Sequence, residues 1–284
     1  MAIVLTDDKH YKAIAGVLRE SYGIPSDAVD DCPYKPSEMS ESIRNRIIDV
    51  RDTSYYNGYY DGESYGVTKG KQEAYDNFWD IYQDRGNGKD YGHAFAGAGW
   101  TEQTFKPKYN IVATNAYMMF MGNKMAIDLV EHLDNLGVAL DVSNATNTNY
   151  MFQATSFTRI GRVDVSGSTG SCPLDNAFAQ CSNLKTIDSI VLKTGTRGEF
   201  NGTFTNCTSL EEVRMEGTIT KDGLNLQWSK KLSKASIANI IGCLSTTTSG
   251  MSITLSSSAV NNAFTEDEWA TLIATKPNWT ISLV

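Results

Sequence analysis

The sequence predicts a mixed α/β repeat protein, a solenoid in which similar units stack side by side. A segment recurs 26 residues later with its apolar positions kept, because Phe178, Cys181, Leu184 and Ile187 are followed by Phe204, Cys207, Leu210 and Val213. Short alternating apolar runs, typical of strands, follow the phenylalanine of each unit. A fixed period of this size indicates units that bury their apolar faces against one another.

The repeat extends toward the N-terminus through three earlier phenylalanines. Phe152 lies 26 residues before Phe178, Phe120 lies 32 before Phe152, and Phe95 lies 25 before Phe120. The extra residues of the longer interval predict an amphipathic helix over residues 125–136. We therefore expect five units, each with a phenylalanine at one equivalent position.

Two of these units resemble the BspA-like leucine-rich repeat. The resemblance is carried by the segments AFAQCSNLKTIDSIVL and GTFTNCTSLEEVRMEGTI, and it continues in weaker form over residues 94–219, where the earlier units lack the cysteine. It implies a leucine-rich-repeat solenoid over residues 89–222. Residues 223–284 would then form an α/β cap, because the last unit of a solenoid must present a polar end.

The wider chain is similar to uncharacterised proteins encoded in phages and prophages of gut Gram-positive bacteria. The similar segments are YKPSEMSESI, GKQEAYDNFWDIYQ, YGHAFAGAGWTEQTF and the ending that runs from LSKASIANIIG to ATKPNWTISLV. Such proteins are usually placed among tail, baseplate or fibre components. The resemblance implies a virion protein whose partners are other virion proteins and a host cell-surface glycan or protein.

Residues 1–52 are predicted to form a helical region. Two helices begin near Thr6 and Pro36, and each places apolar residues on one face. Because two short helices cannot hold a core without a partner, they either cap the solenoid or dock the chain onto a larger assembly. The resemblance to phage proteins favours docking.

Residues 53–88 are predicted to be a Gly/Tyr-rich connector and a capping helix that covers the first repeat. Glycines recur in the connector at every fourth position: Gly58, Gly62, Gly66 and Gly70. One interpretation is a flexible linker. The other is a helix whose glycines allow close approach of another chain, which makes them oligomerisation residues of a homo-oligomer, with a trimer favoured.

The C-terminal region, residues 223–284, alternates between strand and helix patterns. Strands are expected at 224–228, 252–255 and 280–284, with a helix that begins at Ser233 and further helical material over 256–272.

Composition and charge limit the possible function classes. The chain is 41% apolar and 20% charged, as expected of a globular protein. Its net charge of −8 argues against partners such as nucleic acid or an anionic membrane. We find no apolar run of the roughly 20 residues that membrane insertion needs, and no basic region typical of a signal peptide. The expected location is the virion, after synthesis in the host cytoplasm.

The sequence carries no recognisable catalytic, cofactor or metal motif. Its histidines are His10, His93 and His132, and His132 is expected on the solvated face of its helix. Cys181 and Cys207 share one repeat position and are predicted to be buried residues instead of disulfide partners or metal ligands. We therefore predict no catalytic residue, no cofactor and no metal site, and no enzyme activity.

The candidate binding surface lies on polar loops of the repeats, over residues 143–149 and 166–171. Small polar side chains there suit hydrogen bonds to a glycan or peptide: Asn144, Asn147, Asn149, Ser168 and Thr169. A bacterial leucine-rich-repeat adhesin without catalytic activity would use the same surface and is the first alternative function. A carbohydrate-active tail enzyme is the second, and it would need a pair of carboxylates across a sugar cleft. Three acidic pairs of the sequence are expected to be only exposed pairs on turns or strands: Asp61/Glu63, Glu211/Glu212 and Asp267/Glu268.

Overall fold

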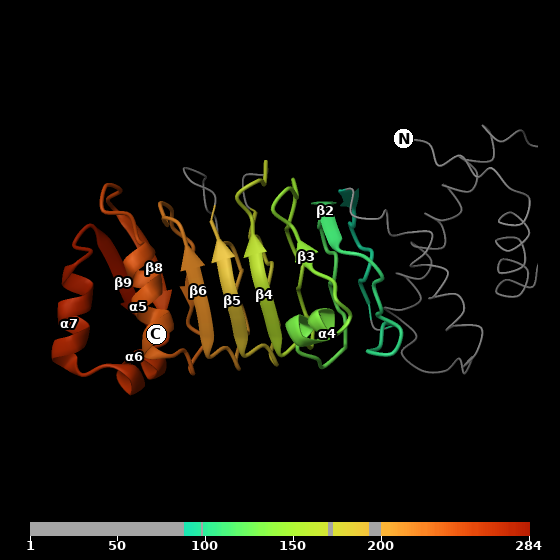
Figure 1. Ribbon diagram of the computed structural model, residues 1–284. Helices are drawn as coiled ribbons and strands as arrows, with labels where there is room; N and C mark the ends of the chain where they lie inside the picture. The colour runs from blue at the N-terminus through green and yellow to red at the C-terminus, as the bar shows by residue number, and fades with distance from the viewer. Residues whose placement is uncertain (1–87, 98, 170–172, 193–199) are drawn as a thin grey trace, which may run out of the picture. The chain divides into compact units, whose positions relative to one another are not determined.

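The computed structural model describes residues 88–97, 99–169, 173–192 and 200–284 (Figure 1). The chain divides into two compact units, Met1–Ala74 and Tyr75–Val284, and all described residues belong to the second. The predictions for the N-terminal helices, the connector and the capping helix lie outside the described residues. The same holds for the predicted oligomerisation residues Gly58, Gly62, Gly66 and Gly70.

The described part of the chain is a mixed α/β structure with small parallel sheets and four helices. The first sheet has the order β1 (Lys89–Asp90), β2 (Ile111–Asn115) and β3 (Leu140–Asp141). The second has the order β4 (Arg159–Asp164), β5 (Thr186–Val191) and β6 (Glu212–Glu216). The third has the order β7 (Asn225–Leu226), β8 (Met251–Leu255) and β9 (Trp279–Leu283). The helices are α4 (Leu129–Asn135), α5 (Lys234–Cys243), α6 (Ser257–Ala263) and α7 (Glu266–Ala274).

Apolar side chains on one face of β4, β5 and β6 set the register of the second sheet. The inward residues are buried: Ile160, Val163, Ile187, Ile190, Val213 and Met215. Ile160 pairs with Ile187, and Ile187 pairs with Val213. Equivalent apolar side chains of successive units therefore lie next to one another, and Figure 1 shows the three strands side by side.

The five equivalent phenylalanines form one buried row. Neighbouring ring centroids lie 5.1, 5.4, 5.7 and 5.7 Å apart along Phe95, Phe120, Phe152, Phe178 and Phe204. From Phe120 onward the interplanar angles are only 7° to 9°. The backbone N–H of each of the first four donates to the carbonyl that precedes the next phenylalanine, at 2.8 to 3.1 Å. The row thus joins side-chain packing to a ladder of backbone hydrogen bonds.

Each phenylalanine sits in a turn between two residues of left-handed backbone conformation. The residues two positions before it have φ between 50° and 63°: His93, Met118, Tyr150, Asn176 and Gly202. The residues two positions after it have φ between 56° and 87°: Gly97, Gly122, Ala154, Gln180 and Asn206. Glycine and asparagine adopt this conformation most easily, and the ladder of backbone hydrogen bonds holds the other residues in it.

In three units, the side chain three residues after the phenylalanine donates a hydrogen bond to the backbone carbonyl of the phenylalanine in the unit before. The Cys181 thiol donates to the Phe152 carbonyl at 2.8 Å, and the Cys207 thiol donates to the Phe178 carbonyl at 3.0 Å. Both cysteines are free and buried, as predicted, and burial raises the pKa of Cys181 to about 11. In an earlier unit Asn123 has the same role, since its Nδ2 donates to the Phe95 carbonyl at 3.1 Å.

Several elements are shorter than the sequence predicts. The helix expected over residues 125–136 is α4, which begins only after Asp128, whose carboxylate accepts from the Glu131 N–H at 2.9 Å. The helical material over residues 256–272 is divided into α6 and α7. The division lies at Thr265, which forms a capping box with Glu268 and therefore begins a new helix.

Candidate functional site

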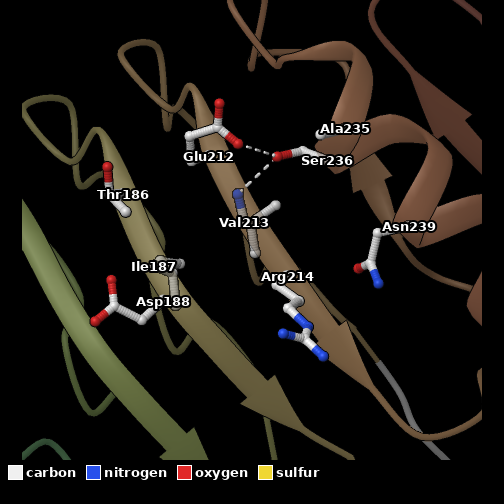
Figure 2. A pocket seen from close by; sticks show the side chains of 9 residues that line it. All are labelled: Thr186, Ile187, Asp188, Glu212, Val213, Arg214, Ala235, Ser236 and Asn239. Carbon is white, nitrogen blue, oxygen red and sulfur yellow. Dashed lines mark hydrogen bonds between the residues drawn. The ribbon is translucent and has the colours of Figure 1, made fainter.

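A groove of about 590 Å³ lies over β5 and β6, and α5 forms its wall (Figure 2). Its lining residues are Thr186, Ile187, Asp188, Glu212, Val213, Arg214, Ala235, Ser236 and Asn239. Because side chains alternate along a strand, the buried Ile187 and Val213 belong to the core, while Asp188 and Arg214 face outward. The groove therefore presents the outward charged side chains of two neighbouring strands beside polar side chains of α5.

Helix α5 takes the place of a further strand beside β6. The Val213 N–H donates to Ser236 Oγ at 3.0 Å, and the Met215 N–H donates to Asn239 Oδ1 at 2.7 Å. Asn239 Nδ2 in turn donates to the Met215 carbonyl at 3.2 Å. Ser236 and Asn239 are three residues apart and therefore share one helix face. This pairing satisfies the edge of β6 and fixes the wall of the groove.

Glu212 is bound at the N-terminus of α5. Its Oε2 accepts hydrogen bonds from Ser233 Oγ at 2.8 Å and from Ser236 Oγ at 2.9 Å. Ser233 is the N-cap of α5, so the carboxylate also lies where the helix dipole favours negative charge. The glutamate that the sequence suggests as one of an exposed acidic pair is thus part of the joint between β6 and α5.

Arg159 connects the start of α4 to β5. Its Nε and Nη2 donate to the two oxygens of Asp188 at 2.8 and 2.9 Å, and its Nη1 lies 3.7 Å from Asp128, the N-cap of α4. The hydrogen bond with Asp188 is the largest influence on Arg159, and it raises the pKa of the guanidinium against the opposing effect of burial. Asp188 is therefore held in one orientation at the groove.

Arg214 is the exposed cation of the groove. The exposed fraction of its side chain is 68%, and its Nε lies 4.0 Å from Glu216. An ion pair that long and exposed contributes little to stability, so the guanidinium is available to a ligand.

The predicted binding residues lie on two adjoining loops, and none of them lines the groove. Asn144 and Thr169 are exposed. Asn147 Oδ1 accepts from the Asn149 N–H at 3.0 Å and shapes the turn. Ser168 is fully buried and its Oγ donates to the Thr146 carbonyl at 3.0 Å. The structure thus brings the two loops together, and it places Ser168 in the joint between them instead of on a ligand-binding surface.

Apart from Glu212, the groove residues were not predicted from the sequence, for two different reasons. Asp188 and Arg214 are separated by one repeat of 26 residues, so a search for charged residues at equivalent outward positions would have found them. Ser236 and Asn239 lie beyond the repeats, and their sequence gives no sign that they pair with the backbone of β6.

Asp164, at the end of β4, predicts a pH-dependent contribution to stability. Its Oδ1 accepts from the Ser166 N–H at 2.9 Å, and Arg162 Nη1 lies 2.9 Å from its Oδ2. Burial alone would raise the pKa of Asp164, but the hydrogen bonds from Ser166 and the Arg162 charge together lower it. Since the folded-state pKa lies below the unfolded one, the stabilisation is present above the unfolded pKa and is lost as the pH falls through the folded pKa.

We expect Asp164→Asn to lower the free energy of unfolding by roughly 1 kcal/mol near neutral pH. The difference from the wild type should shrink in acid, where the wild-type carboxylate is protonated as well. Urea unfolding across a pH series measures this difference, and Asp134→Asn, at an exposed position of α4, is the matched control. A loss that is equally large in acid would show that charge at Asp164 is not its cause.

No protein-family model, no curated protein and no solved structure matches the chain. Across the described ranges, no group of three histidine, cysteine or acidic side chains is arranged to hold a metal ion. In the same ranges, no helix has the length and apolar character needed to cross a membrane.

Proposed function

We propose that the chain is a phage structural protein of the tail, baseplate or fibre that binds a host cell-surface glycan or protein. Its fold would be a BspA-like leucine-rich-repeat solenoid with an N-terminal helical region and an α/β C-terminal cap. The phenylalanine row supports this fold, because five units repeat the same turn and four equivalent backbone hydrogen bonds join them in order. Stacked repeats offer extended binding surfaces formed by equivalent positions.

The observation that carries the binding proposal is that hydrogen bonds within the protein hold the polar side chains that line the groove. Asp188 is held by Arg159, and Asn239 is held by the backbone of β6. Side chains that are already fixed pay little conformational entropy when a ligand binds. The carboxylates of Asp188 and Glu212 both accept hydrogen bonds within the protein, which favours a binding role over acid–base chemistry.

Attachment to the virion would use residues 1–52, and the connector with Gly58 and Gly70 would assemble the chain into a homo-oligomer such as a trimer. This part of the proposal rests on the resemblance to phage proteins. The net charge of −8 supports a host partner that is neither nucleic acid nor an anionic membrane.

Adsorption of the fluorescently labelled full chain to intact cells tests the host-binding role. We expect saturable binding to at least one strain in a panel of gut Gram-positive bacteria, and competition by unlabelled full chain. Binding that never saturates, or that an excess of unlabelled chain fails to displace, would refute receptor binding. A purely architectural role would then remain.

A further inference from the structure

A strip of surface side chains runs along the turns that precede the phenylalanine row. It lies three positions before the phenylalanine of four successive units, where the residues are Tyr117, Asn149, Asp175 and Asn201. The N–H of the residue after each of the first three donates to the carbonyl of the next strip residue, at 3.0, 2.9 and 2.8 Å. These backbone bonds place the four residues next to one another in repeat order. We call them, together with Tyr150, the aromatic–amide strip.

Tyrosine rings form one end of the strip. The rings of Tyr117 and Tyr150 lie 6.1 Å apart with an interplanar angle of 84°, and both side chains are half-buried. Within the part of the chain that the structure describes, neither phenol oxygen has a hydrogen-bond partner. The Tyr117 ring also packs against the His93 ring, with the centroids 5.2 Å apart and an interplanar angle of 78°. Each tyrosine therefore offers the exposed part of its ring together with a hydroxyl, which suits a ligand that is apolar on one side and polar on the other.

A carboxylate held by two amides lies toward the other end of the strip, next to Asn201. Asp175 Oδ1 accepts from Asn176 Nδ2 at 2.7 Å and from Asn201 Nδ2 at 3.0 Å. Among the described residues, Asp175 Oδ2 and the side-chain amide of Asn149 have no hydrogen-bond partner. The carboxylate is thus oriented by one oxygen while the other can accept from a ligand, and the amide can both donate and accept.

The side-chain types of the strip indicate the class of ligand that it suits. A sugar ring has an apolar face of C–H groups that packs on an aromatic ring, and hydroxyls around its edge that bond to amides and carboxylates. The strip has no basic side chain, and the chain carries a net charge of −8, so a polyanionic ligand would be repelled. We infer that the aromatic–amide strip binds an uncharged linear glycan. This inference rests on the proposed host-binding function, and it names a ligand class and a second binding surface, apart from the groove.

In this arrangement sugar rings pack on Tyr117 and Tyr150, and hydroxyls of the next sugars along the glycan bond to Asn149 and Asp175. The strip residues follow one another in repeat order, so successive sugars of the glycan would lie on successive units. Asn149 is one of the residues that the sequence predicts for binding, whereas the groove on β5 and β6 has different lining residues.

The test measures binding of the full chain to an immobilised panel of neutral hexose and N-acetylhexosamine tetrasaccharides. The variants are Tyr117→Asn and Tyr150→Asn, which install the residues that the next unit has at the equivalent positions, Asn149 and Asn176. Asparagine tolerates the positive φ of 57° at position 150, so the turn is kept. We expect each variant to weaken binding about tenfold or more, as removal of an aromatic anchor does.

Trp228→Asn is the matched control, because it replaces an aromatic side chain that is 41% exposed and lies outside the strip; it should leave glycan binding unchanged. Thermal unfolding of each variant separates lost binding from lost folding. The inference is overturned if no neutral tetrasaccharide binds, if both tyrosine variants bind as tightly as the wild type, or if an anionic tetrasaccharide binds equally well.

The same variants in the cell-adsorption assay distinguish this inference from the proposed function. Undiminished adsorption of the double variant Tyr117→Asn/Tyr150→Asn would overturn the strip as the receptor site while host binding stood. Failure of the wild-type chain to adsorb to any strain would overturn host binding itself, whatever the tetrasaccharide result.

Discussion

Phe178→Ala is expected to lower the free energy of unfolding by about 3–5 kcal/mol, as truncation of a buried phenylalanine typically does. The ring is fully buried and stacks on Phe152 and Phe204, each at 5.7 Å and 9°. Removing it leaves a cavity between two rings whose positions are fixed by the backbone ladder, so the site cannot collapse to fill the space. Urea unfolding followed by circular dichroism measures the loss.

The control for the phenylalanine row is Phe264→Ala. Phe264 lies at the end of α6 and is only partly buried. The centroid of its ring lies 5.7 Å from the ring centroid of Trp269 and 5.1 Å from Lys234 Nζ. Its truncation should cost about 1–2 kcal/mol, since the site borders solvent. If Phe178→Ala cost no more than this control, the row would not be the core on which the repeats depend.

Lys276→Met is expected to destabilise the protein by about 3 kcal/mol, because it removes the ammonium that donates to the buried Leu244 carbonyl. Lys276 is only 8% exposed. Its Nζ donates to the carbonyls of Gly242, at 2.9 Å, and Leu244, which lie at the C-terminal end of α5. An ammonium there also complements the helix dipole. Methionine fills the same volume, so the loss would report the missing hydrogen bonds and charge instead of a cavity.

Lys234→Met is the matched control for the buried lysine. Lys234 Nζ lies 2.7 Å from Glu268 Oε1, but both side chains are about half exposed. Exposed ion pairs contribute roughly 0.2–1 kcal/mol to the free energy of unfolding. Chemical unfolding of the two variants compares a buried ammonium with an exposed one. Equal losses would mean that the contacts of Lys276 with the end of α5 do not stabilise the fold.

The sequence was sufficient to predict the interior of the repeats. A 26-residue period located the stacked Phe152, Phe178 and Phe204, and it identified Cys181 and Cys207 as buried residues. These predictions succeed because a stacked core requires the same residue type at the same position in each unit. The alternation of apolar residues likewise predicted the strands at 252–255 and 280–284, which the structure contains as β8 and β9.

Contacts between distant segments could not be predicted in the same way. His132 was expected on the solvated face of its helix, but its Nε2 lies 2.6 Å from the Phe105 carbonyl and its ring stacks on Phe105 at 5.8 Å. Ser168 was expected to contact a ligand and instead joins two loops. Both outcomes depend on residues more than 20 positions away, and no local pattern encodes which of them come into contact.

The side chains of the candidate sites also differ in whether local sequence could predict them. Asn149 was predicted from the polar composition of its loop, whereas Tyr117 and Asp175 become its neighbours only through the backbone ladder between turns. In the groove, Ser236 faces β6 because α5 packs where another strand would lie. Composition identified a polar surface, and three-dimensional arrangement was needed to identify which of its side chains are available to a ligand.

Electron microscopy of virions labelled with gold-conjugated antibody against the full chain tests whether the chain is a structural protein of the virion. The virions would be those released from the strain that encodes the chain. A phage structural protein with a host-binding role predicts gold particles at the tail tip, the baseplate or the fibres, and reduced adsorption of virions that carry the antibody. Intact virions that remain unlabelled, with the protein found only in the cell lysate, would show that the chain is not a structural protein of the virion.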